Sequence, residues 1–263
     1  MTSTLESDSA LAYAVLAPAY DLLTARYEYG PWLAAIERLA RRHGLAGRRV
    51  LDVGCGTGKS FLPLLERGFE VTACDISPEM VADAQRKAGD RAAVVVADMR
   101  RLPVLGEFDL IVCLNDGINH LLGLDEVADA FAGLHANLAP GGLLVFDVTM
   151  LAAYREVPDV VVEDDERLVC WRGAPAELAG PGAEAEIVID IFSDEGDGLW
   201  RRSVSRQRHR HHRVADLRRL AEGAGLVVAA VLGQRPGAVF DDALDERVHR
   251  KAAFVMRREG RSR

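Results

Sequence analysis

The sequence predicts an α/β fold built on a parallel, doubly wound sheet, and three observations support this prediction. Short apolar runs alternate with helical patterns of roughly a dozen residues between residues 50 and 148. A glycine-rich loop at residues 54–58 separates the first strand pattern from a helix pattern. The chain has 263 residues, of which 49% are hydrophobic, so it can bury a large core without disulfide or metal staples.

The elements follow from the hydrophobic periodicity. Residues 10–43 carry apolar and aromatic side chains at three- and four-residue steps, which predicts two or three helices, and Pro31 suits a helix start. Strands are predicted at 50–53, 70–74, 93–97, 108–114 and 143–148, with helices at 61–67, 78–88 and 125–138 and a turn at 140–142. Strands joined by helices run parallel, so these elements predict a doubly wound sheet.

The period changes after Met150. Strand patterns at 160–162, 168–171, 186–192 and 199–207 have no helices between them, so we expect antiparallel hairpins around a loop at 174–183. A helix at 214–225 and strands at 226–232 and 247–256 then resume the α/β pattern. We therefore expect one domain over 1–263: a helical segment 1–48, a core 49–150, an antiparallel β insertion 151–212 and a C-terminal part of the core 213–263.

Composition excludes several classes of function. The chain has 32 basic and 40 acidic residues and a net charge of -8, which argues against nucleic acid as a partner. No stretch has the pattern of a secretory signal or a membrane span, so we expect no membrane partner. The four cysteines show no C-x-x-C pairing, which favours a reducing compartment and a cytoplasmic location.

The glycine loop Gly54-x-Gly56-x-Gly58 lets a ligand approach the backbone at the start of a helix. A plain structural turn is the alternative. Asp75 ends the second predicted strand 17 residues after Gly58, a spacing typical of a carboxylate that binds the ribose hydroxyls of an adenosine. The third glycine comes one residue early for a dinucleotide fingerprint, and Asp52 would repel a pyrophosphate. A ligand with an adenosine and an amino-acid part fits better.

Residues 50–58, Val-Leu-Asp-Val-Gly-Cys-Gly-Thr-Gly, resemble the first motif of the class I S-adenosylmethionine-dependent methyltransferases. Residues 71–80, 97–99, 108–111 and 138–142 resemble the later motifs in the same order, so the resemblance covers about residues 50–147. It implies a Rossmann-like, seven-stranded, mainly parallel sheet with one antiparallel strand at its edge. It also implies an N-terminal helical lid and S-adenosyl-L-methionine as the cofactor.

The resemblance assigns cofactor roles to motif residues. Asp52, Gly54 and Gly56 would meet the methionine end, Asp75 the ribose, Ile76 one adenine face, and Asp98 with Met99 the adenine edge. A helix cap is the alternative role for Asp98. The expected cofactor-binding set also includes Tyr20 in the lid, together with Cys55, Met80, Leu114 and Asn115.

The segment after the fourth predicted strand, residues 113–121, is similar to the corresponding segment of glycine and amino-sugar N-methyltransferases. His120 matches a histidine of the former, and Asp116 replaces an asparagine. We expect His120 or His212 to act as a base if the acceptor is a hydroxyl, and Asp116 to orient an amine acceptor. His120 at a helix start, with a structural role only, is the alternative.

Residues 201–213 form a basic, histidine-containing cluster. Strand alternation predicts that Arg208, Arg210 and His212 lie on one face and that His209, His211 and Arg213 lie on the other. A solvated or dimer-forming face, a substrate-binding face and a metal site are the alternatives, and we expect no metal because no carboxylate or cysteine spacing accompanies the histidines.

The sequence therefore predicts an enzyme that transfers a methyl group to a nitrogen or oxygen of a small molecule. The chain has 29 arginines and three lysines, a composition of GC-rich genomes in which such enzymes tailor specialised metabolites. A homodimer through the β insertion is a further expectation. An NAD-linked oxidoreductase and a non-catalytic cofactor-binding protein are the alternatives.

Overall fold

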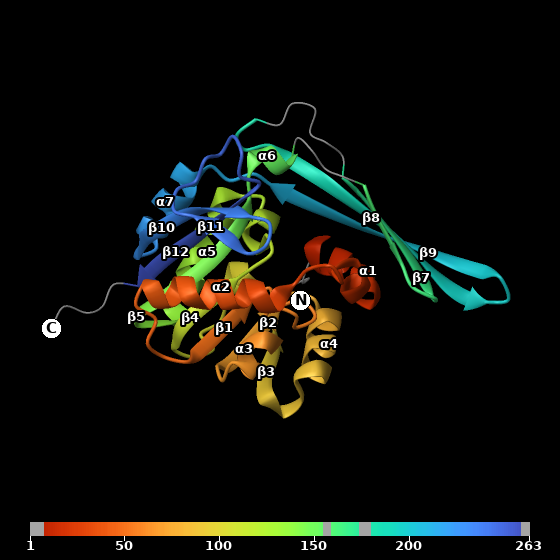
Figure 1. The fold of residues 1–263 in the computed structure, drawn as a ribbon, viewed down its shortest axis with the longest axis horizontal. Coiled ribbons are helices and arrows are strands. Elements are labelled where there is room, and N and C mark those ends of the chain that lie inside the picture. The colour runs from red at the N-terminus through yellow and green to blue at the C-terminus, as the bar shows by residue number, and fades with distance from the viewer. Residues whose placement is uncertain (1–7, 155–158, 174–179, 259–263) are drawn as a thin grey trace, which may run out of the picture.

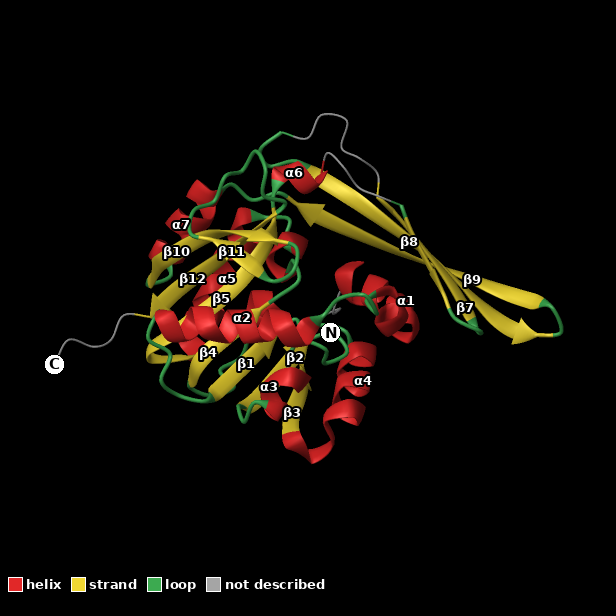
Figure 2. Ribbon diagram, in the orientation of Figure 1, coloured by secondary structure: helices red, strands yellow, loops and turns green. Residues whose placement is uncertain are grey.

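The computed structural model describes residues 8–154, 159–173 and 180–258. They form an eight-stranded main sheet with helices on both faces and a four-stranded antiparallel sheet, called sheet B here, that projects from the core as an arm (Figures 1 and 2). Helix α1 (Asp8–Leu23) lies between the arm and the core.

The main sheet has the strand order β11-β10-β12-β5-β4-β1-β2-β3. Strands β1 to β5 run parallel, which confirms the predicted doubly wound sheet. The antiparallel strand β12 lies between β5 and β10 rather than at the edge, and the short β11 adds an eighth strand that the sequence analysis did not predict. The bounds are β1 (Arg49–Val53), β2 (Glu70–Asp75), β3 (Ala92–Val96), β4 (Phe108–Cys113), β5 (Leu138–Thr149), β10 (Leu226–Arg235), β11 (Val239–Asp241) and β12 (Lys251–Arg258).

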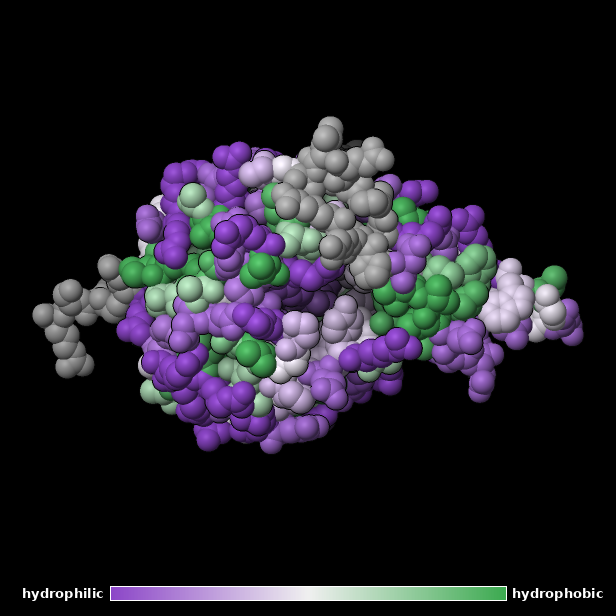
Figure 3. Space-filling view, turned by 45° about the horizontal axis from the view of Figure 1, so that its top comes forward, coloured by the Kyte–Doolittle hydropathy of each residue, from purple (hydrophilic) through white to green (hydrophobic). Residues whose placement is uncertain are grey.

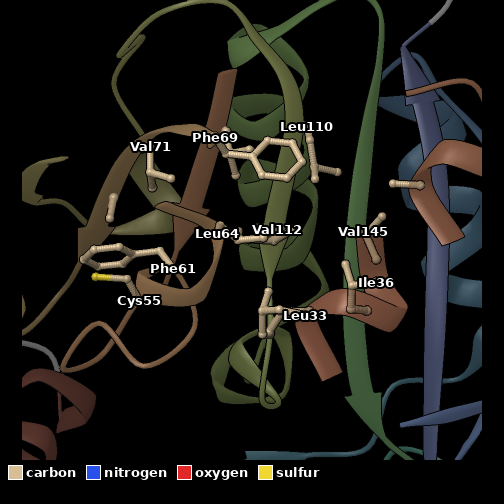
Figure 4. Packing of buried hydrophobic residues seen from close by; sticks show 14 of the residues in the cluster. Leu33, Ile36, Cys55, Phe61, Leu64, Phe69, Val71, Leu110, Val112 and Val145 are labelled. Carbon is tan, nitrogen blue, oxygen red and sulfur yellow. The ribbon is translucent and has the colours of Figure 1, made fainter. Parts of the chain in front are cut away.

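Helices bury both faces of the main sheet. On one face α2 (Tyr29–Arg42), α3 (Leu62–Glu66) and α4 (Pro78–Ala88) contribute side chains to a core with Val112 and Val145 (Figure 4). On the other face α5 (Leu124–Asn137) and α7 (Val214–Gly223) pack against Phe146 and Phe254. Burial on both faces explains the continuous apolar runs of β4 and β5.

Two strand boundaries differ from the prediction. β5 begins at Leu138 rather than residue 143, because a bulge extends the pairing with β4 back to Leu138, beside Phe108 at the start of β4. A Cβ atom on Gly142 would lie 2.8 Å from the carbonyl oxygen of Phe108, so the close approach needs glycine. β12 begins at Lys251 rather than residue 247, because the amides of Val248 and His249 close a turn onto the carbonyl of Asp245.

Sheet B confirms the predicted hairpins. Its strands are β6 (Val160–Glu163), β7 (Arg167–Gly173), β8 (Glu184–Gly196) and β9 (Leu199–Arg210), paired antiparallel in chain order. Most of the predicted loop at 174–183 lies outside the described residues. One face of sheet B packs on α1, where Leu16 and Leu23 meet Val169 and Ile189. The arm is thus attached to the core through α1.

The opposite face of sheet B carries the basic cluster. Arginines of β9 pair with acidic side chains of β8: Arg202 with Asp190 at 2.6 Å, and Arg206 with Glu186 at 3.4 Å. The cluster is therefore charge-compensated within its own sheet. Figure 3 also shows apolar side chains gathered on the arm. Val161 of β6 is one of the exposed apolar residues of sheet B.

Short helices complete the described chain: η1 (Gly89–Arg91), η2 (Met99–Arg101), η3 (Gly117–His120) and α6 (Leu151–Tyr154). None of the helices in the described ranges combines the length and the apolar character that a membrane span requires.

Candidate active site

The carboxyl ends of β1 to β4 and the inner side of α1 enclose a small pocket of about 90 Å³, which we call the cofactor pocket. Nine of the residues predicted to bind the cofactor line it. They are Tyr20, Gly54, Gly56, Asp75, Ile76, Asp98, Met99, Leu114 and Asn115. Ligands of open α/β sheets bind at this edge because polar side chains and free backbone groups converge there.

The glycine loop forms one wall of the cofactor pocket. Gly54, Gly56 and Gly58 have φ angles of +75°, +53° and +92°, a region that L side chains rarely adopt. A Cβ atom on Gly56 would lie 3.6 Å from the ring of Tyr20. The loop can therefore pass close to α1 and to a ligand between them.

Asp75 is the best-placed carboxylate of the cofactor pocket. Its Oδ2 accepts the backbone N–H of Gly56 at 2.8 Å, and its Oδ1 accepts that of Ser77 at 2.9 Å. Burial raises the pKa of Asp75, and the backbone N–H groups oppose this shift. Each oxygen keeps a second acceptor site, so two neighbouring hydroxyl groups such as those of a ribose suit this carboxylate.

Asp98 lies on the pocket wall and is held by Arg100, which lines the same pocket. It caps η2 by accepting the backbone N–H of Arg100 at 2.9 Å, and it pairs with the guanidinium of Arg100 at 2.6 Å. Arg100 also reaches Glu126 at 3.0 Å. The structure thus combines the predicted pocket position of Asp98 with its alternative role as a helix cap.

Three predicted cofactor residues lie behind the pocket wall. Cys55 and Met80 are buried in the core. One oxygen of the Asp52 carboxylate accepts the hydroxyl of Ser60, and the other is buried without a hydrogen-bond partner among the described residues. Burial raises the pKa of Asp52 to about 7. An ammonium group beside the loop would favour the ionised carboxylate, as the cofactor's amino-acid end would provide.

His120 lines the cofactor pocket and belongs to a chain of three side chains from distant elements. Its Nε2 lies 2.9 Å from the hydroxyl of Tyr13 in α1 and 3.0 Å from Nε2 of His209 in β9. Burial lowers the pKa of His120 well below its usual range, and the nearby His209 lowers it further, so the ring of His120 is neutral at pH 7. Its Nδ1 is buried without a partner in the part of the chain that the structure describes.

His212 lies elsewhere, which corrects the predicted alternation. β9 ends at Arg210, so His212 does not share a face with Arg208. It is buried, and its Nε2 hydrogen-bonds the carbonyl oxygen of Leu121 at 2.9 Å. The histidine that β9 brings to the pocket is His209, because every second residue of the strand faces α1 and the core.

Asp116 lies in a strained turn just outside the cofactor pocket. Asn115 and Asp116 have φ angles of +64° and +70°, unusual for consecutive residues other than glycine. Asp147 Oδ1 accepts the backbone N–H of Asn115 at 2.6 Å, and Lys251 lies 2.9 Å from Asp116 and 2.8 Å from Asp147. This partly buried cluster holds the turn in place.

Four residues at the site were not predicted from the sequence: Tyr13, His209, Asp147 and Lys251. Two of them carried a signal: Asp147 interrupts an apolar strand, and Lys251 is one of three lysines in the chain. Among the described residues, no group of three or more His, Cys, Asp or Glu side chains is placed to share a metal ion.

A second cavity of about 850 Å³, which we call the outer cavity, adjoins the cofactor pocket and shares Asn115 with it. It lies between the start of α2, the turn from β10 to β11 and the start of β12. Tyr29, Trp32, Gln234, Arg235 and Lys251 are among the residues that line it.

Comparisons with known proteins agree with this geometry. A family model described as a methyltransferase domain matches residues 50–142. A protein of Geobacillus sp. (strain WCH70) that bears a methyltransferase name is 28% identical over 255 residues, 94% of this chain and all of that protein. The glycine/sarcosine N-methyltransferase of Parasynechococcus marenigrum (strain WH8102) is 40% identical over 115 residues, which span 42% of this chain and 40% of the relative.

Two solved structures share the fold over most of the chain. An S-adenosylmethionine-dependent methyltransferase from Clostridium acetobutylicum ATCC 824 has a TM-score of 0.77 at 20% identity, covering 92% of this chain and 97% of the other. The sugar N-methyltransferase KedS8 from Streptoalloteichus sp ATCC 53650 has a TM-score of 0.74 at 23% identity, and the match covers 91% of this chain and 92% of that protein. With the matched motifs and the glycine-loop pocket, these findings identify the chain as a class I S-adenosylmethionine-dependent methyltransferase.

Proposed function

We propose that this enzyme methylates a nitrogen or oxygen of a small molecule that binds in the outer cavity. The observation that carries the proposal is the adjacency of the two cavities, which share Asn115. A volume of about 850 Å³ lies within the range of small-molecule sites. The names of two similar proteins, a glycine/sarcosine and a sugar N-methyltransferase, also point to small acceptors.

The residues of the cofactor pocket fit S-adenosylmethionine. When bound, this group supplies a methyl attached to a positively charged sulfur. The Gly54–Gly56 backbone would hold its amino-acid end, the free acceptor sites of Asp75 its ribose, and Ile76 and Met99 its adenine. Tyr13 and Tyr20 of α1 cover the pocket and exclude water, so the chain contributes mainly positioning.

His120 is the group we propose to accept a proton from a hydroxyl acceptor. It lines the pocket, its ring is neutral, and its Nδ1 has no partner among the described residues. Asp116, beside the shared Asn115, would orient an amine acceptor. His212 is committed to the Leu121 carbonyl, so we assign the proton transfer to His120 alone.

We further propose a role in specialised metabolism and a cytoplasmic location. The first is supported by the arginine-rich composition and by the similarity to a sugar N-methyltransferase. The second is supported by the free thiols of all four cysteines, which suit a reducing compartment.

A second copy of the chain is the partner we propose for the outer face of sheet B. This face carries Val161, Val188 and Phe192 between the arginine–carboxylate pairs. Light scattering would test the dimer: a Val161→Glu variant should run as a monomer at a concentration at which the unmodified chain runs as a dimer.

Calorimetric titration with S-adenosylmethionine, S-adenosylhomocysteine and NAD tests the cofactor, and release of S-adenosylhomocysteine over a panel of amine and hydroxyl acceptors tests the reaction. We expect binding of the first two and turnover with an amine or hydroxyl. Binding of NAD alone would support the oxidoreductase, and cofactor binding without turnover on any acceptor would support a non-catalytic protein.

A further inference from the structure

The outer cavity has a wall composition that differs from the rest of the chain. Four cations, Arg26, Arg235, Arg250 and Lys251, line it with a single carboxylate, Glu28. Lys251 is paired with Asp116 and Asp147, and the Nε of Arg235 is paired with Asp241. The cationic groups of the wall that can meet a ligand are therefore Arg26 and the terminal nitrogens of Arg235. Such a wall attracts an anionic group.

Arg235 is pre-oriented for a ligand. Its Nε donates to Asp241 Oδ2 at 2.6 Å, which holds the guanidinium plane. In the part of the chain that the structure describes, its two terminal nitrogens have no hydrogen-bond partner, and Arg26 forms no ion pair. A fixed guanidinium with free terminal N–H groups matches the geometry of a carboxylate or phosphate.

Two further polar atoms of the wall lack a partner. Trp32 Nε1, a donor, and Gln234 Oε1, an acceptor, are both buried without a hydrogen bond to any described residue. A buried polar atom without a partner costs about 1–3 kcal/mol, so each calls for a complementary group in the cavity. A ligand that accepts from the indole and donates to the amide would supply both.

The aromatic side chains define the body of the ligand. Tyr29 and Trp32 pack with ring centroids 5.9 Å apart, and Tyr27 lies 6.5 Å from Tyr29. All three line the cavity, which gives a flat ring a surface to stack on. α2 also begins here at Tyr29 without a side-chain cap, so the positive end of its dipole adds to the attraction of an anion.

We propose that the acceptor is a ring-containing molecule with an anionic group, larger than an amino acid such as glycine. Its ring stacks on Trp32, its anionic group lies between Arg26 and Arg235, and its nucleophile reaches Asn115 at the boundary with the cofactor pocket. This inference rests on the proposed function, because it assigns the outer cavity to the methyl acceptor.

Binding of two matched probes tests the anion site. Calorimetry on the protein saturated with S-adenosylhomocysteine compares 1-naphthyl phosphate with 1-naphthol. We expect the phosphate to bind at least about tenfold more tightly, since a charged pair adds more than a neutral hydrogen bond. Equal affinity for the two probes, or no binding of either, would overturn the proposal.

Variants locate the site. The double variant Arg26→Gln with Arg235→Gln should remove the preference for the phosphate. The control double variant Arg86→Gln with Arg219→Gln, at exposed positions of α4 and α7, changes the charge equally and should keep the preference. Trp32→Phe retains a ring and should weaken both probes to the same small extent. An equal loss in both double variants would mean that only net charge matters, and the proposal would fail.

Turnover separates this inference from the proposed function. Release of S-adenosylhomocysteine is measured with 4-aminobenzoate and aniline, and with glucosamine 1-phosphate and glucosamine. Methylation without preference for the anionic member of each pair would contradict the inference and leave the function intact. Probe binding at Arg26 and Arg235 with no methylation of any acceptor would contradict the function and leave the anion site.

Discussion

The main sheet and sheet B use β-structure in different ways. The main sheet is buried by helices on both faces, and its functional groups extend from strand ends into the cofactor pocket. Sheet B buries one face on α1, and it reaches the site through His209, a residue within β9. The main sheet therefore supplies the cofactor pocket, while sheet B fixes the lid helix and one histidine behind it.

The contacts of sheet B show that the lid helix α1 and the arm form one structural unit. The Ser205 hydroxyl of β9 donates to the Ala12 carbonyl of α1 at 2.9 Å, and Tyr13 of α1 reaches His120 at 2.9 Å. At its other end α1 is tied to the glycine loop, where Thr57 donates to Asp21 at 2.6 Å. Changes in sheet B should thus be felt at the pocket through α1.

The largest expected effect is on the attachment of the arm. Ile189 is fully buried between sheet B and α1, so Ile189→Ala should cost about 3 kcal/mol. Hydrogen exchange should show lost protection in α1 and β7 to β9 only. The matched Phe146→Ala in the main sheet should lower protection throughout. Equal loss in β1 to β5 for Ile189→Ala would mean that the two regions unfold as one unit.

The next effect concerns the cofactor pocket. Asp75→Asn keeps the size of the side chain but removes its charge, so the dissociation constant for S-adenosylhomocysteine should rise about 30-fold, about 2 kcal/mol. Calorimetry measures this change, with Asp90→Asn on the exposed η1 as the control. An unchanged dissociation constant would remove Asp75 from the cofactor site.

The main sheet should lose stability as the pH rises. Burial raises the pKa of Asp52 to about 7. The contribution of Asp52 to the free energy of unfolding is therefore complete below pH ~4, the ordinary pKa of an aspartate, and is lost as the pH rises through 7. Asp52→Asn should flatten this dependence, on the order of 2 kcal/mol, in denaturant unfolding of the cofactor-free protein between pH 5.5 and 8. If the unfolding free energy of the variant declines as steeply with pH, the dependence comes from another titrating group.

Sheet B should show the opposite dependence. Burial lowers the pKa of His209 to about 4, while Asp116 raises it and Lys251 lowers it; the ring of His120 also faces that of His209. The contribution is therefore present above pH ~6.5 and lost as the pH falls through 4. His209→Gln should reduce the loss of unfolding free energy on the acid side by on the order of 1 kcal/mol per pH unit. A slope unchanged from the parent chain would contradict the assignment.

The smallest effect is expected on the outer face of sheet B. Arg208 and Glu184 form an exposed cross-strand pair, and such pairs contribute about 0.5 kcal/mol or less. A double-mutant cycle with Arg208→Gln and Glu184→Gln measures the coupling, which salt should reduce. The cycle is measured at a concentration at which the chain is monomeric, and a coupling above about 1 kcal/mol there would show that this face is less solvated than its exposure indicates.

Much of the cofactor pocket was predictable because its residues are local in sequence. The glycine loop, Asp75 and Met99 each follow directly after a strand, and parallel strands bring their ends to one edge. The bulge at Gly142 and the short β11 were not predictable, because each depends on a contact with a distant strand.

The fold class, the order of the strands along the chain and the cofactor were predictable from the sequence, since hydrophobic periodicity and short-range motifs indicate them. That His209 rather than His212 meets His120 depends on packing, because the face of β9 that lies against α1 carries His209 and the strand ends at Arg210, before His212. Packing also decides that Lys251 joins Asp116 and Asp147 across more than 100 residues of chain. Such contacts depend on how two sheets and a helix pack, which no local pattern encodes.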